Sequence, residues 1–393
     1  MSRLLCFLKR SMKILHTSDW HIGKKLMGRE RYDEYRALLG EISAICESEQ
    51  VELVLVAGDV FDTYTPSAEA ESIFFDGVKD IAKHSAVLVI SGNHDDYVRL
   101  TAASAFTEEL NVYIIGNNSH SVSCGKDFPV RPVVSDNGYI IFGNGKGEKV
   151  YINILPYPNE ARFKEGKSDE TFSEKALRWI SYGERGKTEK LPSLFLSHIF
   201  VAGGSVSDSE REIDLGGARA VALDALPACD YCALGHLHKR QKIGENAYYS
   251  GAIMQFSFDE AGAEKSVNVF DLNADGVSDF HTVTLNSGRK LIRLQANGAQ
   301  EGIFLLNGYG GYYVELTLNL SEPLTPVESA QLHSCENLVS LKADVRRAEA
   351  AFAGVSNKNK SSSQLFTEYY KFRYDCNPPE DLLALFLSLT EEE

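Results

Sequence analysis

The chain has 393 residues, 44% of them hydrophobic, which is enough to bury a full core in two or three domains. Its formal net charge of -15 argues against broad, unspecific attraction to nucleic acid or to an anionic membrane, because like charges repel at long range. It has no apolar run of roughly 18 residues, the length that a membrane-spanning helix needs. Its seven cysteines lack the spacing of a disulfide framework, so we expect a reducing compartment, the cytoplasm.

Residues 1–11, MSRLLCFLKRS, place a few apolar residues between basic ones, and this segment is too short for a secretory signal. We interpret the segment as a dispensable leader. Strand-forming sequence begins directly after Met12, which makes Met12 a candidate for the natural start.

Five short runs of apolar or β-branched residues in the first 240 residues have the length of buried strands. They cover residues 13–17, 51–57, 86–91, 193–197 and 231–234. Helical patterns at 32–48 and 68–84 separate the first three runs, which gives the order of βαβ units. Polar residues follow each run, and the ligand sites of open α/β sheets lie beyond the carboxyl ends of their strands.

From residue 116 onward, Gly, Asn, Ser and Lys turns separate short strands, which predicts hairpins and one helix that complete a sandwich. The strands cover residues 139–142, 150–155, 248–250, 266–271 and 280–285, and the helix covers 173–182. We place the boundary of this first domain near Ser287, so that the domain covers residues 12–287.

Residues 288–356 are predicted to form a small α+β module. Its strands cover residues 290–295, 312–320 and 338–345, and its helix covers 326–335. Residues 357–363, NKNKSSS, have the composition of a flexible linker. Two helical patterns follow at 364–375 and 379–389, and a short helical pair at a terminus is typical of a segment that docks on a partner.

Five clusters at the ends of the predicted strands supply metal ligands. They are Asp19-Trp20-His21, Gly58-Asp59, Gly92-Asn93-His94-Asp95, Ser197-His198 and Gly235-His236-Leu237-His238, and the seven ligands are Asp19, His21, Asp59, Asn93, His198, His236 and His238. Asp19 and His21 are two residues apart at a strand end and point to one face, and the two oxygens of Asp59 can bridge two cations. Nitrogen and oxygen ligands without thiolate favour manganese, iron or zinc. The set predicts a two-metal phosphoester hydrolase.

Such a hydrolase needs a proton donor for the leaving group. His94 can face the site without binding a metal, and Asp62 can orient and charge it as a carboxylate–imidazole pair, with a turn or helix cap as the alternative role of Asp62. Basic residues follow the first and last clusters, and they are candidates for contacts to DNA, with solvated loops as the alternative. They are Lys24, Lys25, Arg29, Lys239 and Arg240.

The succession DWH, GDVFD, GNHD, SH and GHLH resembles the calcineurin-like metallophosphoesterase superfamily over about residues 12–285. HTSDWHIGK at 16–24, VAGDVFDT at 56–63, SVSDSER at 205–211, ALGHLHK at 233–239 and SFDE at 257–260 are similar to SbcD-type nuclease subunits, the bacterial counterparts of the meiotic-recombination nuclease. The resemblance covers nearly the whole chain. It implies a four-layer α/β (α+β) sandwich, a small α+β capping, DNA-binding domain at 288–356 and C-terminal helices at 364–393.

The resemblance also implies a site for two Mn2+ ions. Asp19, His21, Asp59 and His238 would hold one ion, Asp59, Asn93, His198 and His236 would hold the other, and His94 would be the general acid. Related archaeal and eukaryotic nucleases carry a histidine where this sequence has Asp62, whereas bacterial relatives carry aspartate. The pairing of Asp62 with His94 is therefore compatible with the bacterial branch.

The family resembled here acts in DNA repair as an ATP-dependent double-strand 3'-5' exonuclease and as an endonuclease on single strands and hairpins. Its partner is an SbcC-type coiled-coil ABC ATPase, which we expect to bind residues 365–389. The family is also dimeric, and residues 68–84 and 99–110 are the candidate interface. Apolar residues there, such as Ile73 and Phe74, are equally expected in an ordinary core.

Two other interpretations stay open. The chain could be another phosphoesterase of the same superfamily, a phosphatase or phosphodiesterase, although such an enzyme needs no capping module or leucine-bearing tail. It could also be a non-catalytic scaffold that binds DNA ends or an ATPase. The complete ligand set and His94 argue against a decayed active site, but they do not exclude a structural role for the metals.

Overall fold

The computed structural model describes residues 11–159, 162–163, 169–188, 190–207, 219–345, 361–374 and 376–390. The predicted leader lies outside these residues except for Ser11, and so does the predicted linker except for residues 361–363. The chain divides into two compact units. One takes in the residues up to Leu318 together with Thr325–Ala343, and the other takes in Asn319–Leu324 and the residues from Asp344 onward.

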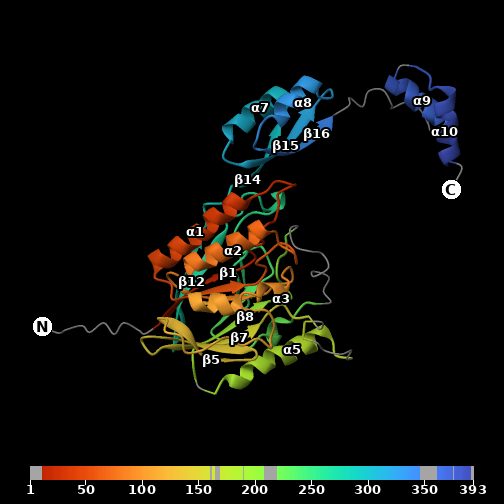
Figure 1. Cartoon of the computed structure of the whole chain (residues 1–393). Helices are drawn as coiled ribbons and strands as arrows, with labels where there is room; N and C mark the ends of the chain where they lie inside the picture. Colours follow the sequence, from red (N-terminus) through yellow and green to blue (C-terminus); the bar gives the residue numbers. More distant parts are fainter. Residues whose placement is uncertain are drawn as a thin grey trace. The chain divides into compact units, whose positions relative to one another are not determined.

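The first sheet has six strands in the order β13-β12-β1-β2-β3-β4. They are β1 (Met12–Thr17), β2 (Leu53–Ala57), β3 (Ala86–Ile90), β4 (Val112–Ile115), β12 (Ser266–Asn273) and β13 (Gly276–Thr284). Strands β1 to β4 are parallel, and β12 and β13 are added antiparallel. Helices α1 (Tyr32–Glu49) and α2 (Ala68–Ile81) lie side by side over this sheet (Figure 1). Two short helices, α3 (Tyr97–Leu100) and α4 (Ser104–Thr107), follow β3.

The second sheet has seven strands in the order β10-β11-β9-β8-β7-β6-β5. They are β5 (Val130–Asp136), β6 (Tyr139–Asn144), β7 (Lys149–Leu155), β8 (Ser193–His198), β9 (Tyr231–Gly235), β10 (Gln241–Ile243) and β11 (Ala247–Tyr249). Strands β7, β8, β9 and β11 are parallel, whereas β5 and β6 form the hairpins that the turn-rich sequence predicts. Helix α5 (Phe172–Gly183) packs against β7.

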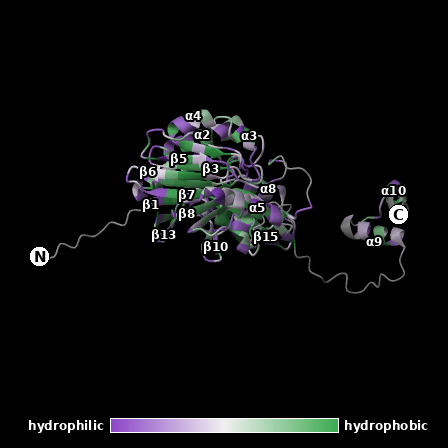
Figure 2. Ribbon diagram, turned by 90° about the horizontal axis from the view of Figure 1, so that it is seen from below, coloured by the Kyte–Doolittle hydropathy of each residue, from purple (hydrophilic) through white to green (hydrophobic). Residues whose placement is uncertain are grey.

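The two sheets pack face to face, with helices on both outer sides. In β2, Leu53 and Leu55 belong to the core between the sheets, while Val54 and Val56 belong to the core beneath α1 and α2. Trp179 of α5 belongs to a third core on the outer side of the second sheet. Both faces of the central strands are therefore apolar. In Figure 2, the ribbons of β3 and β7 carry the colour of hydrophobic residues. The predicted four-layer α/β sandwich is confirmed.

A third sheet forms the small α+β module. Its strands are β14 (Leu291–Ala296), β15 (Tyr313–Leu320) and β16 (Leu338–Val345), in sequence order in the sheet, and its helices are α7 (Ala299–Gly308) and α8 (Pro326–His333). The three strands and α8 agree with the sequence prediction. Helix α7 was not predicted, because its sequence AQEGIFLLNG contains two glycines and no side-chain cap. It provides the crossover that the parallel pair β14 and β15 requires.

The second unit contains helices α9 (Ser362–Tyr374) and α10 (Glu380–Thr390). The rings of Phe366 and Phe386 stack with their centroids 4.1 Å apart, which joins the two helices. Helix α9 begins earlier than the linker prediction allowed, because Ser361 bonds with Gln364 across the first turn. Within the described part of the chain, no helix combines the length and the apolar character needed to cross a membrane.

Candidate metal centre

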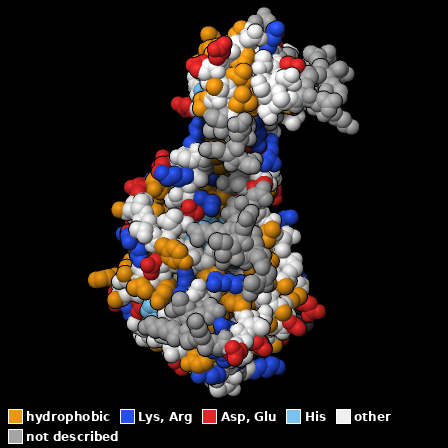
Figure 3. All heavy atoms as spheres, turned by 90° about the vertical axis from the view of Figure 1, so that its right-hand side faces the viewer, with side chains coloured by type: hydrophobic (Ala, Val, Ile, Leu, Met, Phe, Trp, Pro, Cys, Tyr) orange, Lys and Arg blue, Asp and Glu red, His pale blue; other side chains and the backbone are white. Residues whose placement is uncertain are grey.

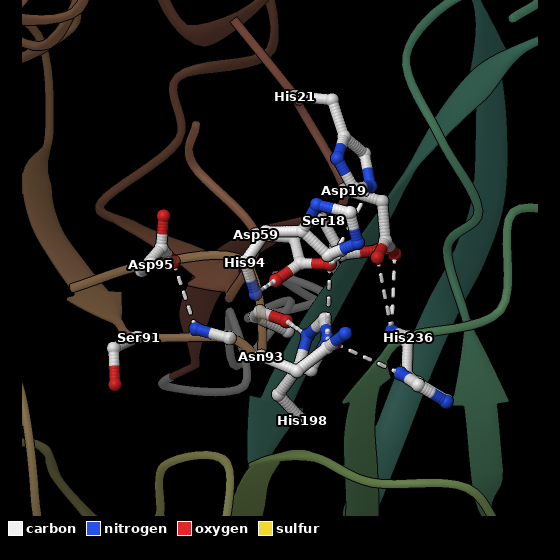
Figure 4. A network of polar contacts seen from close by, with 12 residues as sticks. Ser18, Asp19, His21, Asp59, Ser91, Asn93, His94, Asp95, His198 and His236 are labelled. Carbon is white, nitrogen blue, oxygen red and sulfur yellow. Dashed lines mark hydrogen bonds and ion pairs between the residues drawn. The ribbon is translucent and has the colours of Figure 1, made fainter. Parts of the chain in front are cut away.

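The carboxyl ends of five strands deliver the seven predicted ligands to one place. Asp19 and His21 follow β1, Asp59 follows β2, Asn93 follows β3, His198 ends β8, and His236 and His238 follow β9. Most of these side chains are seen in Figure 4, where they point toward one another from both sheets. The predicted convergence at the strand ends is present in the structure.

The turns that carry the ligands have unusual backbone conformations. Asp19, His21, Asp59 and His236 have φ angles of 53°, 45°, 50° and 106°, in the left-handed region that costs non-glycine residues on the order of 1 kcal/mol each. The turns after β1 and β2 hold each other, since the His21 N–H donates to the Asp59 carbonyl at 2.9 Å and the Asp19 N–H donates to the Gly58 carbonyl at 3.0 Å. This strain fixes the direction of the ligand side chains.

Glycines next to the ligands allow the loops to approach closely. A Cβ atom on Gly92 would lie 2.1 Å from an Asp59 carboxylate oxygen, and one on Gly235 would lie 1.9 Å from the Ala57 carbonyl oxygen. Both distances are far below van der Waals contact. The GNHD and GHLH motifs therefore need glycine for steric reasons.

The first donor group consists of Asp19, His21 and His238. One donor atom from each of the three lies within 4.8 Å of the others, and the two histidine Nε2 atoms are 3.0 Å apart. The Asp19 carboxylate accepts hydrogen bonds from the Ser18 hydroxyl at 2.5 Å and from the His236 N–H at 3.0 Å. Burial lowers the pKa of His21 to about 4, so its imidazole is neutral and can offer a nitrogen lone pair to a cation at neutral pH.

The second donor group consists of Asn93, His198 and His236. The Asn93 amide oxygen lies 2.9 Å from His198 Nε2 and 3.1 Å from His236 Nδ1. His198 Nδ1 lies 2.7 Å from the Ala57 carbonyl, so Nδ1–H donates to it and Nε2 points into the site.

Asp59 lies between the two groups. Its Oδ2 is 3.5 Å from His21 Nε2 and 3.4 Å from His198 Nε2, while its Oδ1 accepts a hydrogen bond from the His94 N–H at 2.8 Å. A single carboxylate therefore contacts both donor groups. This is the position of the predicted bridging ligand.

The electrostatics of the centre favour cations. Asp19 and Asp59 are 0% and 2% exposed, and burying two carboxylates so close together is unfavourable without positive charge. Burial raises the pKa of Asp19 to about 7. Burial would lower the pKa of His198, but the charge and hydrogen bond of Asp59, together with the Asp19 charge and the Ala57 carbonyl, raise this pKa to about 9. The residues fit two divalent ions, which would supply the missing positive charge.

His94 lies beside the Asp59 carboxylate, with its Nε2 4.0 Å from Asp59 Oδ2. Its Nδ1 is 2.7 Å from the main-chain carbonyl of Asp62, so Nδ1–H donates there and Nε2 faces the site. The Asp62 carboxylate is 3.9 Å from His94 Nδ1, but it accepts a bond from Lys24 Nζ at 3.2 Å and lies 3.5 Å from His21 Nδ1. Asp62 thus orients His94 through its main-chain carbonyl, while its carboxylate lies within ion-pair distance of His94 and also contacts Lys24 and His21.

The sequence pattern of the calcineurin-like phosphoesterase family matches residues 12–240. A curated relative from Bacillus subtilis (strain 168), named as the SbcD component of the nuclease SbcCD, is 34% identical over 97% of this chain and 99% of its own length. The chain belongs to the SbcD family of calcineurin-like phosphoesterases. Relatives with the same name from Rhodobacter capsulatus and Staphylococcus epidermidis are 34% and 27% identical. They align over 73% and 92% of this chain and over 72% and 93% of their own lengths.

A solved structure, described as GAP50, the anchor in the inner membrane complex of Plasmodium, aligns with 86% of this chain and 98% of its own at 11% identity. Its TM-score is 0.42, which is too low to carry an argument. The match to the SbcD family confirms the prediction that this chain is an SbcD-type nuclease subunit. It also confirms its classification as a metal-dependent nuclease. The roles of individual residues in this chain stay predictions.

The predicted DNA-binding residues of the SbcD chain differ in their surroundings. Lys25 pairs with Glu30 at the surface. Arg29 donates to the main-chain carbonyls of Glu336 and Leu338, at 2.5 and 2.6 Å, and so ties the loop after β1 to the small α+β module. Lys239 and Arg240 line a cavity of about 560 Å³, and the predicted ligand His238 lines the same cavity.

Two buried residues near the ligands were missed as site residues. The Asp95 carboxylate accepts hydrogen bonds from the N–H groups of Gly92, Val60 and Phe61, at 2.8, 3.2 and 2.9 Å, which joins the loops after β2 and β3. Its place in the GNHD motif was a usable signal. Arg162 also contacts the loop after β3, but it lies in a stretch without a motif, so a single sequence gave no signal for it.

Proposed function

We propose that this SbcD-family chain hydrolyses DNA phosphodiester bonds with two divalent metal ions, preferentially Mn2+, at the centre described above. The observation that carries the proposal is the Asp59 carboxylate, which contacts both donor groups while His94 lies beside it. Two-metal sites of this kind act on phosphoesters. The curated relatives are named as components of a nuclease, which favours DNA over other phosphoesters as the substrate.

Two ions bound here would polarise the phosphodiester and lower the pKa of the attacking water. Asp19 and Asp59 would balance the charge of the ions, and the neutral donors Asn93 and His236 would leave a net positive site for the phosphate. His94 Nε2 would donate a proton to the leaving oxygen. The Asp62 carbonyl holds the other ring nitrogen and keeps Nε2 directed at the site.

DNA attraction would be local rather than general, because the chain carries a net charge of -15. On the face shown in Figure 3, acidic and basic side chains are interspersed and form no single basic field among the described residues. Lys239 and Arg240, in the cavity beside His238, are the predicted basic residues best placed for a DNA backbone entering the site. Lys24, next to Asp62, would contact the phosphate nearest His94.

The preferred substrates would be DNA ends, cut as an ATP-dependent 3'-5' exonuclease, and single strands and hairpins, cut as an endonuclease. The ATP would be hydrolysed by an SbcC-type coiled-coil ATPase that binds residues 365–389. Within that range, Leu365 and Leu385 are 37% and 56% exposed. The relatives are named as one component of a nuclease called SbcCD, which supports such a partner.

A homodimer would form through residues 97–110 rather than through α2. Ile73 and Phe74 of α2 are buried in the core of their own chain. Val98 and Phe106 are 62% and 77% exposed, on the helices that follow the GNHD loop. Exposed apolar residues of this size on two successive helices favour a protein contact there.

The test is cleavage of a hairpin oligonucleotide by the purified chain with Mn2+, alone and with its ATPase partner, compared with hydrolysis of a chromogenic phosphodiester. We expect His94→Gln to lower kcat by about 10²- to 10⁴-fold while Mn2+ uptake stays unchanged. His84→Gln, at an exposed histidine outside the ligand clusters, is the matched control. If the wild-type chain leaves DNA intact with Mn2+ and the partner, hydrolysis of the chromogenic phosphodiester would support another phosphoesterase, and no hydrolysis of either substrate would support the scaffold interpretation.

A further inference from the structure

Arg162 is a buried cation on the connection between β7 and α5, 7% exposed, and belongs to none of the predicted ligands or catalytic groups. Its guanidinium donates to the Gly92 carbonyl at 2.9 Å and to the Asp95 carbonyl at 2.7 Å, and also to the Ser91 hydroxyl at 3.2 Å. These acceptors flank Asn93 and His94 on both sides. One side chain therefore holds both ends of the loop that carries a metal ligand and the general acid.

The surroundings of Arg162 also favour a role in holding the loop of Asn93 and His94. The rings of Tyr97 and Tyr157 lie 5.6 and 5.3 Å from the guanidinium carbon, in the range of cation–π contacts. The Tyr157 N–H also donates to the Ser91 carbonyl at 3.0 Å, so the same connection contacts the loop twice. A planar guanidinium with five donors can reach two carbonyls at once, which a lysine ammonium matches only in part.

The loop has little freedom to shift without disturbing the centre. The Asn93 amide oxygen lies 2.9 Å from His198 Nε2, and Gly92 lies so close to Asp59 that a Cβ atom on it would force the loop to move. A displacement of about 1 Å would separate Asn93 from His198 and His236 and move His94 away from the position of the scissile phosphate. Misplacements of this size can lower a rate by about 10²-fold.

We propose that Arg162 is a positioning residue, which sets the loop of Asn93 and His94 so that the second metal and the general acid are in register. This inference rests on the proposed two-metal hydrolysis. Arg162 itself touches neither the substrate nor a metal. It acts through the carbonyls of Gly92 and Asp95.

The test compares Arg162→Gln and Arg162→Lys with the wild-type chain, with Arg131→Gln as the matched control. Arg131 lies near the start of β5, outside the ligand loops, and its side chain donates to the Phe128 carbonyl. We expect Arg162→Gln to lower kcat for hairpin cleavage by about 10²-fold with little change in KM. We expect it to weaken binding of the second Mn2+ and to reduce the exchange-coupled two-manganese signal in electron paramagnetic resonance. Arg162→Lys should restore part of both properties.

A second measurement needs no metal and no activity. Hydrogen–deuterium exchange of metal-free protein should become faster in peptides covering residues 91–95 in Arg162→Gln, and peptides of α1 should not change. If Arg162→Gln fails to fold, the measurements on Arg162→Lys test the proposal by themselves. The proposal requires that this variant, too, binds the second Mn2+ ion more weakly than the wild-type chain.

The proposal is overturned if both variants keep the wild-type kcat and two-manganese signal, or if they lower only the melting temperature. Failure of the proposed function gives a different result, because the wild-type chain itself would then bind no manganese pair or leave DNA uncut.

Discussion

The metal centre and the C-terminal helices use their side chains in opposite ways. At the centre, polar side chains are buried: Asp19 is 0% and His238 is 3% exposed. On α9 and α10, large apolar side chains are exposed, with Tyr369 at 55% and Leu385 at 56%. Buried carboxylates that share a site favour a nearby cation, whereas exposed apolar side chains favour a protein partner. The centre is thus built from this chain's own residues, whereas α9 and α10 expose a surface suited to another protein.

The largest expected effect comes from removing the charge shared by the two donor groups. Asp59→Asn keeps the size of the side chain but removes the negative charge that both groups contact. We expect a loss of about 10³-fold in kcat, because a bridging carboxylate contributes several kcal/mol to the binding and placement of two ions. Cleavage of a hairpin oligonucleotide and calorimetric titration with Mn2+ measure the two consequences.

Asp76→Asn, on the exposed face of α2, controls for the loss of one acidic group. The bridging role would be disproved if Asp59→Asn still bound two Mn2+ ions with wild-type affinity.

In the wild-type chain, Mn2+ at about 1,000 times its Kd should stabilise the fold by about 4 kcal/mol, and chelation should remove this gain. A chain whose melting temperature does not respond to Mn2+ would contradict the metal centre itself.

A steric change in the same loop should have the next largest effect. Gly92→Ala places a Cβ atom 2.1 Å from an Asp59 oxygen, so the loop must move away from the bridging carboxylate. We expect about a 10²-fold loss of kcat and a destabilisation of about 1–3 kcal/mol, measured by hairpin cleavage and by urea denaturation. The control is Gly145→Ala, because nothing lies within 4 Å of a Cβ atom there. Equal activities of these two variants would refute the close approach.

Part of the metal centre and of the fold could be predicted from a single sequence. The convergence of the seven predicted ligands could be predicted because each one lies at the end of an apolar strand, and the carboxyl ends of such strands meet. The carbonyl contact from Asp62 to His94 and the clamp from Arg162 were not predictable, since both use main-chain oxygens, which leave no residue pattern. The β7–α5 connection and the loop after β3 are distant in sequence. They come into contact because the second sheet, which contains β7, packs on the first sheet, which contains β3. Helix α7 was missed because its composition is weakly helical and tertiary packing decides its conformation.

The C-terminal helices give the third prediction. Leu382→Glu with Leu385→Glu changes side chains that are 36% and 56% exposed on α10, so the fold should lose no more than about 0.5 kcal/mol. Binding to the coiled coil of the ATPase partner should weaken at least about tenfold, with the chain's own Mn2+ binding unchanged. Leu177→Glu, 49% exposed on α5, is the matched control in the same affinity measurement. Wild-type affinity in the double variant would remove α10 from the partner interface.

The smallest effect should come from the basic residues beside the centre. Lys239 lines the cavity that contains His238, whereas Lys25 is paired with Glu30 at the surface. If a DNA phosphate enters that cavity, Lys239→Gln should weaken DNA binding and reduce the slope of log affinity against log salt by about 1, because one fewer counterion is released. Lys25→Gln should leave the slope unchanged, since its charge is already compensated. Fluorescence anisotropy of a labelled hairpin at several salt concentrations measures both slopes. If Lys25→Gln instead reduced the slope and Lys239→Gln did not, the DNA would contact the loop after β1 and not the cavity. Lys25 would then have to leave its ion pair with Glu30 when DNA binds.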